Sequence, residues 1–191
     1  MKRHLIIPDT QVKPGVPLDH FKWIGAAIMD YRPDVVVHLG DHWDFPSLSH
    51  WDRGKPKKME GRRLKDDIEV GNEAMDILLK PLRRCRSYKP RLIFLHGNHE
   101  DRLTRQIDAF PQELDGLVSF NDLNLSAWKA YPYLKPVVAD GIAYAHYFYN
   151  PMSGRPFGGT AHTKLKNIGC SFTMGHQQGK DYAERQLPTG G

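Results

Sequence analysis

Five side chains of metal-binding types each stand just past an apolar run of the sequence: Asp9, Asp41, Asn98, His146 and His176. Short apolar runs of this kind predict buried strands, and open α/β sheets place their sites beyond the carboxyl ends of their strands. Two carboxylates, one amide and two imidazoles suit a borderline or hard divalent cation, whereas structural zinc sites usually contain thiolates. A turn or a helix cap explains any one of these residues, but the five together predict a metal centre.

The elements that must position these residues alternate between strands and helices. Strands are predicted at residues 5–7, 34–39, 92–95, 137–138, 142–145 and 171–174, and helices at 18–31, 62–86, 101–110, 122–128 and 160–168. The first strand, helix and strand form a βαβ unit, which implies parallel pairing. Residues 44–61 are expected to form a long loop, Pro81 to kink or shorten the second helix, and Cys170 to lie in the core.

Composition narrows the class of protein. A chain of 191 residues with 40% apolar and 26% charged residues is expected to form one domain, residues 1–191, with a full core. No run is long enough to cross a bilayer or to serve as a signal peptide, so no membrane partner is expected. Two cysteines without motif spacing favour a reducing, cytoplasmic protein. The formal net charge of +5 favours a polyanionic partner, and the oligomeric state is not defined by the sequence.

The motifs around these residues resemble those of the calcineurin-like metallophosphoesterases, with a general likeness to phage-type members. They are Asp9-Thr10-Gln11, Gly40-Asp41-His42-Trp43-Asp44, Gly97-Asn98-His99-Glu100, His146 and Gly175-His176-Gln177-Gln178. The resemblance implies a four-layer α/β/β/α sandwich. The chain stops about a dozen residues after the last motif, where family members usually continue, so either a truncated form or a small second sheet is expected.

The resemblance also implies two metals, bridged by Asp41. One metal would be held by Asp41, Asn98, His146 and His176. The other would be held by Asp9, Gln11, Asp41 and Gln178, and here the chain departs from the family pattern, which has histidines at the two glutamine positions. Neutral amide oxygens suit magnesium, manganese or calcium better than late transition metals. We therefore expect one tight and one weaker site, with manganese or magnesium favoured and zinc, iron or nickel as alternatives.

The chemistry expected of such a site is attack of a metal-activated water on phosphorus. His99 is the candidate general acid toward the leaving oxygen, or an electrostatic stabiliser of the transition state, and either Asp44 or Glu100 is expected to orient it. His42, beside a ligand motif, and Arg155, in a glycine-rich loop, are candidate substrate contacts. The simpler interpretation of both is a solvated loop residue.

Three functions remain open from the sequence. A phosphodiesterase or nuclease is favoured because a basic stretch from Arg53 to Lys65, with Trp51 nearby, could follow a nucleic-acid backbone, although such a stretch is often only a solvated face. A phosphomonoesterase is the first alternative; protein phosphatases of this pattern usually have arginine at the position of Asp44. The second alternative is a non-catalytic metal-binding scaffold, which the presence of His99 beside a complete ligand set disfavours.

Overall fold

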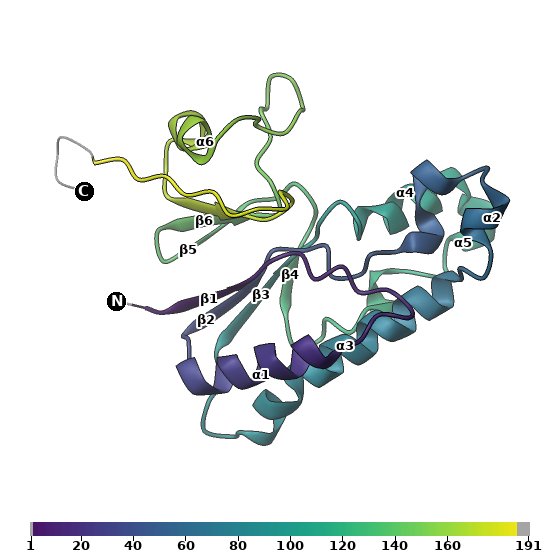
Figure 1. Ribbon diagram of the computed structural model, residues 1–191, viewed down its shortest axis with the longest axis horizontal. Coiled ribbons are helices and arrows are strands. Elements are labelled where there is room, and N and C mark those ends of the chain that lie inside the picture. The colour runs from purple at the N-terminus through teal and green to yellow at the C-terminus, as the bar shows by residue number, and fades with distance from the viewer. Residues whose placement is uncertain (1, 187–191) are drawn as a thin grey trace.

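Two β-sheets pack face to face between layers of helices in the computed structural model, which describes residues 2–186 (Figure 1). Helices α1 (Asp19–Tyr31) and α3 (Leu64–Arg84) cover the outer face of the first sheet. Helix α6 (Ala161–Ile168) packs on the outer face of the second. The order of layers is therefore α/β/β/α, as the family resemblance implied.

The first sheet consists of four parallel strands in the order β1-β2-β3-β4. Their bounds are His4–Ile7, Val35–His38, Arg91–Leu95 and Lys129–Tyr131. Side chains alternate between the two faces of a strand, so Val36 packs toward the helices while Val35 and Val37 pack toward the second sheet. Both faces are covered, which explains why β2 is buried along its whole length.

The second sheet is smaller and mixed. Strands β5 (Val137–Ala139) and β6 (Ile142–Ala145) form the antiparallel hairpin predicted around Asp140-Gly141, and β7 (Phe172–Met174) lies parallel to β6. Because β6 and β7 both run toward the same edge as the strands of the first sheet, the residues that follow them, His146 and His176, meet the ends of β1, β2 and β3.

The segment between β2 and α3 is more ordered than the expected loop. It contains the short helices η1 (Pro46–Leu48), η2 (His50–Asp52) and α2 (Pro56–Met59). It lies at one end of the molecule beside α4 (Asp101–Ala109) and α5 (Pro111–Leu114), as Figure 1 shows. Within residues 2–186, no helix has the length and apolar character needed to span a membrane.

Four details of local structure differ from expectation. Residues 122–128 do not form a helix; instead Ser119 caps the 3-10 helix η3 (Phe120–Asp122), and Asp122 completes that capping box. The short strand β4 was missed because Lys129-Ala130-Tyr131 is mostly exposed at the sheet edge and lacks an apolar pattern. Cys170 is exposed and precedes β7. Helix α3 runs through Pro81 and ends at Arg84, two residues earlier than expected.

Candidate metal centre

Donor atoms from four separate loops meet at the carboxyl edge of the two sheets. Asp41, His146 and His176 each offer an atom within 4.8 Å of the others. Nε2 of His146 lies 2.9 Å from Oδ1 of Asn98, 3.2 Å from Nδ1 of His176 and 3.4 Å from Oδ2 of Asp41. The structure thus brings together all four residues expected at the tighter site.

The hydrogen bonding of His146 fits a cation at this point. Its Nδ1 lies 2.8 Å from the backbone oxygen of Leu39, which can only accept, so Nδ1 carries the proton. In the neutral ring, Nε2 then carries an unshared lone pair, which faces the oxygens of Asn98 and Asp41. Acceptors that face one another repel unless a cation lies between them. A metal-bound histidine typically donates its other ring N–H to a carbonyl in this way.

Asp9 supplies a second sign that a cation fits this centre. Its Oδ2 accepts the backbone N–H of His176 at 2.8 Å, but its buried Oδ1 has no hydrogen-bond partner within residues 2–186. Oδ1 lies 3.7 Å from Nδ1 of His146. Burial and the charge of Asp41 raise the pKa of Asp9, although His146 opposes the shift. An orphaned carboxylate oxygen next to a second carboxylate is the environment that a divalent cation stabilises.

Two glycines make room for these carboxylates. A Cβ atom on Gly97 would collide with Oδ1 of Asp41, and one on Gly175 would collide with Oδ1 of Asp9. The backbone of both ligand motifs therefore approaches a carboxylate more closely than any other residue would allow. The φ of Gly97 is not in the positive region, so glycine is needed there for the close approach and not for the backbone conformation.

His99 lies beside this centre with both ring nitrogens engaged. Nδ1 is 2.8 Å from Oδ1 of Asp44, and Nε2 is 3.7 Å from Oδ2 of Asp41. Burial opposes a charge on the ring, but the hydrogen bond from Asp44 and the charge of Asp41 outweigh it and raise the pKa of His99. Of the two residues proposed to orient His99, the structure selects Asp44.

Arg102 was not identified from the sequence. Its Nη2 lies 3.0 Å from Nε2 of His99, and its Nη1 donates to the backbone oxygen of Asp44 at 2.8 Å. Approach of a guanidinium N–H at this distance requires Nε2 to accept, so in this arrangement His99 carries its proton on Nδ1. The available signal was the spacing of three residues between His99, just before α4, and Arg102 in its first turn, because residues so spaced lie on one side of a helical turn.

Glu100 has a different role from the one expected. It is fully buried and does not orient His99. Its two oxygens accept four backbone N–H groups, from Asp41, His42, Trp43 and Gly97, at 2.7–3.1 Å. Burial and the charge of Asp41 raise its pKa to about 7, against the effect of these N–H groups. Glu100 thus ties the loop after β2 to the loop after β3.

The two candidate substrate contacts lie in contrasting places. His42 is fully buried: its ring bonds to Thr10 and to the backbone oxygen of Gly71, and burial lowers its pKa to about 4. This conformation gives His42 no access to a substrate. Arg155 lies on the exposed loop between β6 and α6, and its guanidinium makes no hydrogen bond within residues 2–186.

Among the described residues, no hydrogen bond connects the side chains of the two glutamines, Gln11 and Gln178. Gln11 is half-buried, and its backbone N–H donates to the carbonyl of Asp41 at 2.8 Å. Gln178 is exposed, and its side chain forms no hydrogen bond among the described residues. Its neighbour Gln177 instead accepts from the buried Lys164 at 2.8 Å. The weaker metal site therefore remains a prediction.

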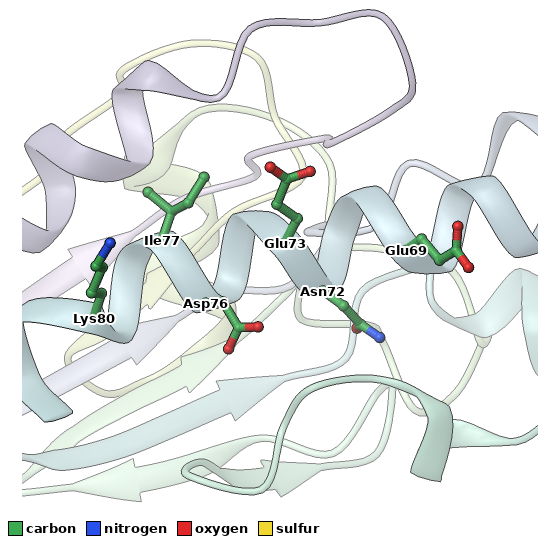
Figure 2. Close-up of a pocket in the computed structure, with 6 residues that line it drawn as sticks. All are labelled: Glu69, Asn72, Glu73, Asp76, Ile77 and Lys80. Atoms are coloured by element: carbon green, nitrogen blue, oxygen red, sulfur yellow. The ribbon is translucent and has the colours of Figure 1, made fainter.

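Two hollows on the described part of the surface lie outside this centre. One of about 440 Å³ runs along α3 (Figure 2), and its lining residues are Glu69, Asn72, Glu73, Asp76, Ile77 and Lys80. Asn72 and Asp76 bond to Asn124 and so attach α3 to the loop before β4, which gives them a structural role. Another, of about 660 Å³, lies between α6, β7 and residues 181–185, behind the loop that carries His176.

Comparison with known proteins agrees with this geometry. A family model for the calcineurin-like phosphoesterases matches residues 3–178. The chain is 28% identical to the Gene 54 protein of Mycobacterium phage L5 over 199 aligned positions, which span 100% of this chain and 74% of that protein. It is 38% identical to the Gene 54 protein of Mycobacterium phage D29 over 104 positions, 53% of this chain and 37% of that one. No solved structure matches.

The family match and the phage relatives agree with the residues of the site and with its motifs. The matched residues include every candidate ligand, and both relatives are phage proteins, in keeping with the phage-type likeness of the motifs. The chain therefore belongs to the calcineurin-like phosphoesterase family, whose members are divalent-metal-dependent hydrolases of phosphoesters.

Proposed function

We propose that this protein is a metal-dependent phosphodiesterase, with nucleic acid as its favoured substrate. The observation that carries the proposal is the placement of His99, held by Asp44, directly beside the cluster of Asp41, Asn98, His146 and His176. A metal-binding scaffold needs only the cluster. A proton donor fixed next to it is required for the departure of an alcohol.

A divalent cation in the cluster would activate the attacking water and neutralise charge on the phosphoryl oxygens. The protein's own residues handle the leaving group. Because Asp44 engages Nδ1 of His99, only Nε2 can present a proton to the leaving oxygen. Arg102, at 3.0 Å from Nε2, is placed to move onto a phosphoryl oxygen, after which Nε2 would take up a proton from solvent, as the raised pKa of the ring favours, and pass it to the leaving oxygen.

A second, weaker metal position is proposed at Asp9 and Asp41, completed by Gln11 and Gln178. The unpartnered Oδ1 of Asp9 supports it. Since the amide ligands would be neutral oxygens, we propose manganese or magnesium for this position. Cys85 and Cys170 are both free thiols, which suits the reducing cytoplasm that we propose as the setting.

The distribution of charge supports a polyanionic substrate. Residues 51–65, here called the basic segment, contain seven Lys or Arg and two acidic residues, while the rest of the chain has equal numbers of both signs. The formal excess of +5 thus lies entirely in this segment. Arg53 in the segment donates to Gln106 of α4 at 2.6 Å, which fixes the segment to the helix that starts at the His99 loop. Trp51 is 79% exposed and available for stacking on a base.

Hydrolysis of model esters tests the proposal. Metal-stripped protein supplied with manganese should hydrolyse bis(p-nitrophenyl) phosphate faster than p-nitrophenyl phosphate, and a chelator should abolish both activities. A preference for the monoester would favour the phosphomonoesterase alternative. Tight metal binding without hydrolysis of either ester, or of single-stranded DNA and RNA, would identify the protein as a scaffold instead.

A further inference from the structure

Beneath the metal centre lies a buried chain of polar side chains, Thr10, His38 and His42. We propose that these are positioning residues, which hold the loops of Asp9 and Asp41 in the geometry that a metal requires. The inference rests on the proposed metal-binding role of those two carboxylates. Neither Thr10 nor the two histidines belongs to the candidate ligand set.

These three hydrogen-bonded side chains join three elements through short contacts. Oγ1 of Thr10 lies 2.9 Å from Nδ1 of His42 and 3.3 Å from Nε2 of His38. Nε2 of His42 lies 3.0 Å from the backbone oxygen of Gly71 in α3, and Nδ1 of His38 accepts the N–H of Gly40 at 3.2 Å. Both histidines are fully buried. The hydrogen bonds of Thr10, His38 and His42 therefore connect the loop after β1, the end of β2 and the first half of α3.

The partners at the two ends fix the direction of every hydrogen bond. The oxygen of Gly71 only accepts, so Nε2 of His42 donates to it and Nδ1 of His42 must accept. The N–H of Gly40 only donates, so Nδ1 of His38 accepts and Nε2 of His38 must donate. Thr10 then accepts from His38 and donates to His42. A hydroxyl is the group that can do both at this position, and both rings are satisfied without a charge.

The loops that this chain anchors are strained. Gln11, next to Thr10, has φ +45°, and Asp41, next to His42, has φ +51°. Residues with a Cβ atom avoid this left-handed region, and such conformations persist only where the surroundings impose them. A backbone hydrogen bond of 2.8 Å joins Gln11 to Asp41. Glu100 holds the Asp41 loop from one side, and the Thr10 chain holds both loops from the other.

Substitution of Thr10 tests the proposal against metal affinity. Thr10→Val keeps the shape but removes the hydroxyl, whereas Thr10→Ser keeps the hydroxyl. Titration calorimetry with manganese on chelator-stripped protein should show affinity weakened about 10- to 100-fold by Thr10→Val, the range known for groups that orient metal ligands. Thr10→Ser should bind within a few-fold of the native protein. Native protein that binds no manganese would refute the proposed function itself.

A destabilised control separates positioning from simple loss of stability. Ile28→Val creates a small cavity in the core under α1, remote from the loops. If it lowers the melting temperature as much as Thr10→Val but leaves manganese affinity unchanged, the effect of Thr10 is geometric. Equal manganese affinity in Thr10→Val and the native protein would overturn the proposal.

A measurement on the native protein covers the case in which Thr10→Val does not fold. Long-range proton–nitrogen NMR spectra of the metal-free protein at neutral pH should show the rings of His38 and His42 neutral, each with its proton on Nε2. A proton on Nδ1 of either ring would break the deduced order of donors and acceptors. That result would also overturn the proposal.

Discussion

The imidazole of His99 shows how two neighbours define the task of one side chain. Asp44 occupies Nδ1, so the ring is oriented and only Nε2, which Arg102 contacts at 3.0 Å, can turn to a substrate. Nε2 lies 3.7 Å from the carboxylate of Asp41, which is itself a candidate ligand. The imidazole and a metal position are thereby held at a fixed separation before any substrate binds, and the raised pKa of the ring favours the protonated form that acid catalysis needs once Arg102 has left Nε2.

Replacement of this ring should separate catalysis from metal binding. We expect His99→Ala to lower turnover about 10²- to 10⁴-fold, because the leaving oxygen loses its proton donor. Metal content, measured by elemental analysis, should not change, since the cluster around His146 remains intact. Asp108→Asn, an exposed change on α4, the helix that follows His99, serves as the control and should retain activity. Undiminished turnover in His99→Ala would exclude the ring from the mechanism.

The two glutamines make a prediction that sets this chain apart from the family pattern. If Gln11 and Gln178 share one metal, the native protein should bind one manganese ion tightly and a second one weakly, because neutral amides are poorer donors than imidazoles. Gln11→His combined with Gln178→His should tighten the second site, and each single change should do less. Titration calorimetry resolves the two sites. Two equally tight sites in the native protein would show that the amides do not weaken binding.

Much of this site could be predicted from sequence because its ligands follow one rule. Asp41, His146 and His176 each come just after a strand, and parallel strands bring such positions to one edge. The roles of Glu100 and His42 could not be predicted in this way. Whether a polar residue of a turn points into the opening or into the core depends on tertiary contacts, and both side chains point inward.

Among the elements, the basic segment is where the proposed nucleic-acid substrate makes its clearest prediction. Lys57 and Arg63 are exposed and form no ion pair within residues 2–186, so their charges are available to phosphates. A duplex or single strand bound by such charges releases counterions, which makes affinity fall steeply with salt. The segment begins seven residues after Asp44, the residue that contacts His99.

Reversal of these charges should weaken nucleic-acid binding without harming the chemistry. We expect Lys57→Glu with Arg63→Glu to lower the affinity for a single-stranded oligonucleotide and to flatten its salt dependence, as measured by fluorescence anisotropy in the presence of a chelator. Hydrolysis of a small diester should be unchanged. Lys80→Glu, an exposed change on α3, is the matched control (Figure 2). A flat salt response of the native protein would identify the segment as an ordinary solvated face.

The elements themselves were predictable in proportion to their burial. β2 and β3 are apolar and buried, and their positions were predicted to within a residue or so. β4 carries Lys129 and Tyr131 at an exposed edge, and no periodic pattern marks it. Asp122 is a typical capping residue and predicts a helix through Trp128, whereas its carboxylate instead accepts the backbone N–H of Ser119 and closes the capping box of η3.

Across the whole molecule, three buried histidines outside the candidate ligand set couple folding to pH. They are His38, His42 and His96. Burial lowers the pKa of each, and for His42 and His96 to about 4. The unfolded chain binds protons at these rings below pH 6.5 while the folded chain does not, so stability falls as the pH falls. Glu100 acts in the opposite sense, because burial raises its pKa and the folded state takes up its proton first.

Since these effects oppose one another, removal of one group gives the clearest test. His96 packs between Phe94 and Phe120, and its buried Nδ1 has no hydrogen-bond partner within residues 2–186. His96→Phe abolishes proton uptake at this position. The quantity to compare is the difference in unfolding free energy between the variant and the native protein. From its value at pH 7.5, this difference should shift in favour of the variant by about 1 kcal/mol at pH 5.5 and by about 3 kcal/mol at pH 4.

Urea denaturation at each pH, with a chelator present, measures this difference, and any constant cost of fitting the larger ring cancels in the comparison. The gain should appear only as the pH falls below 6.5, because the pKa of His96 is lowered and its neutral form is the one that the fold accommodates. If the two proteins lose stability in parallel from pH 7.5 to pH 4, His96 is protonated without penalty in the folded state. Its burial would then not be coupled to acid unfolding.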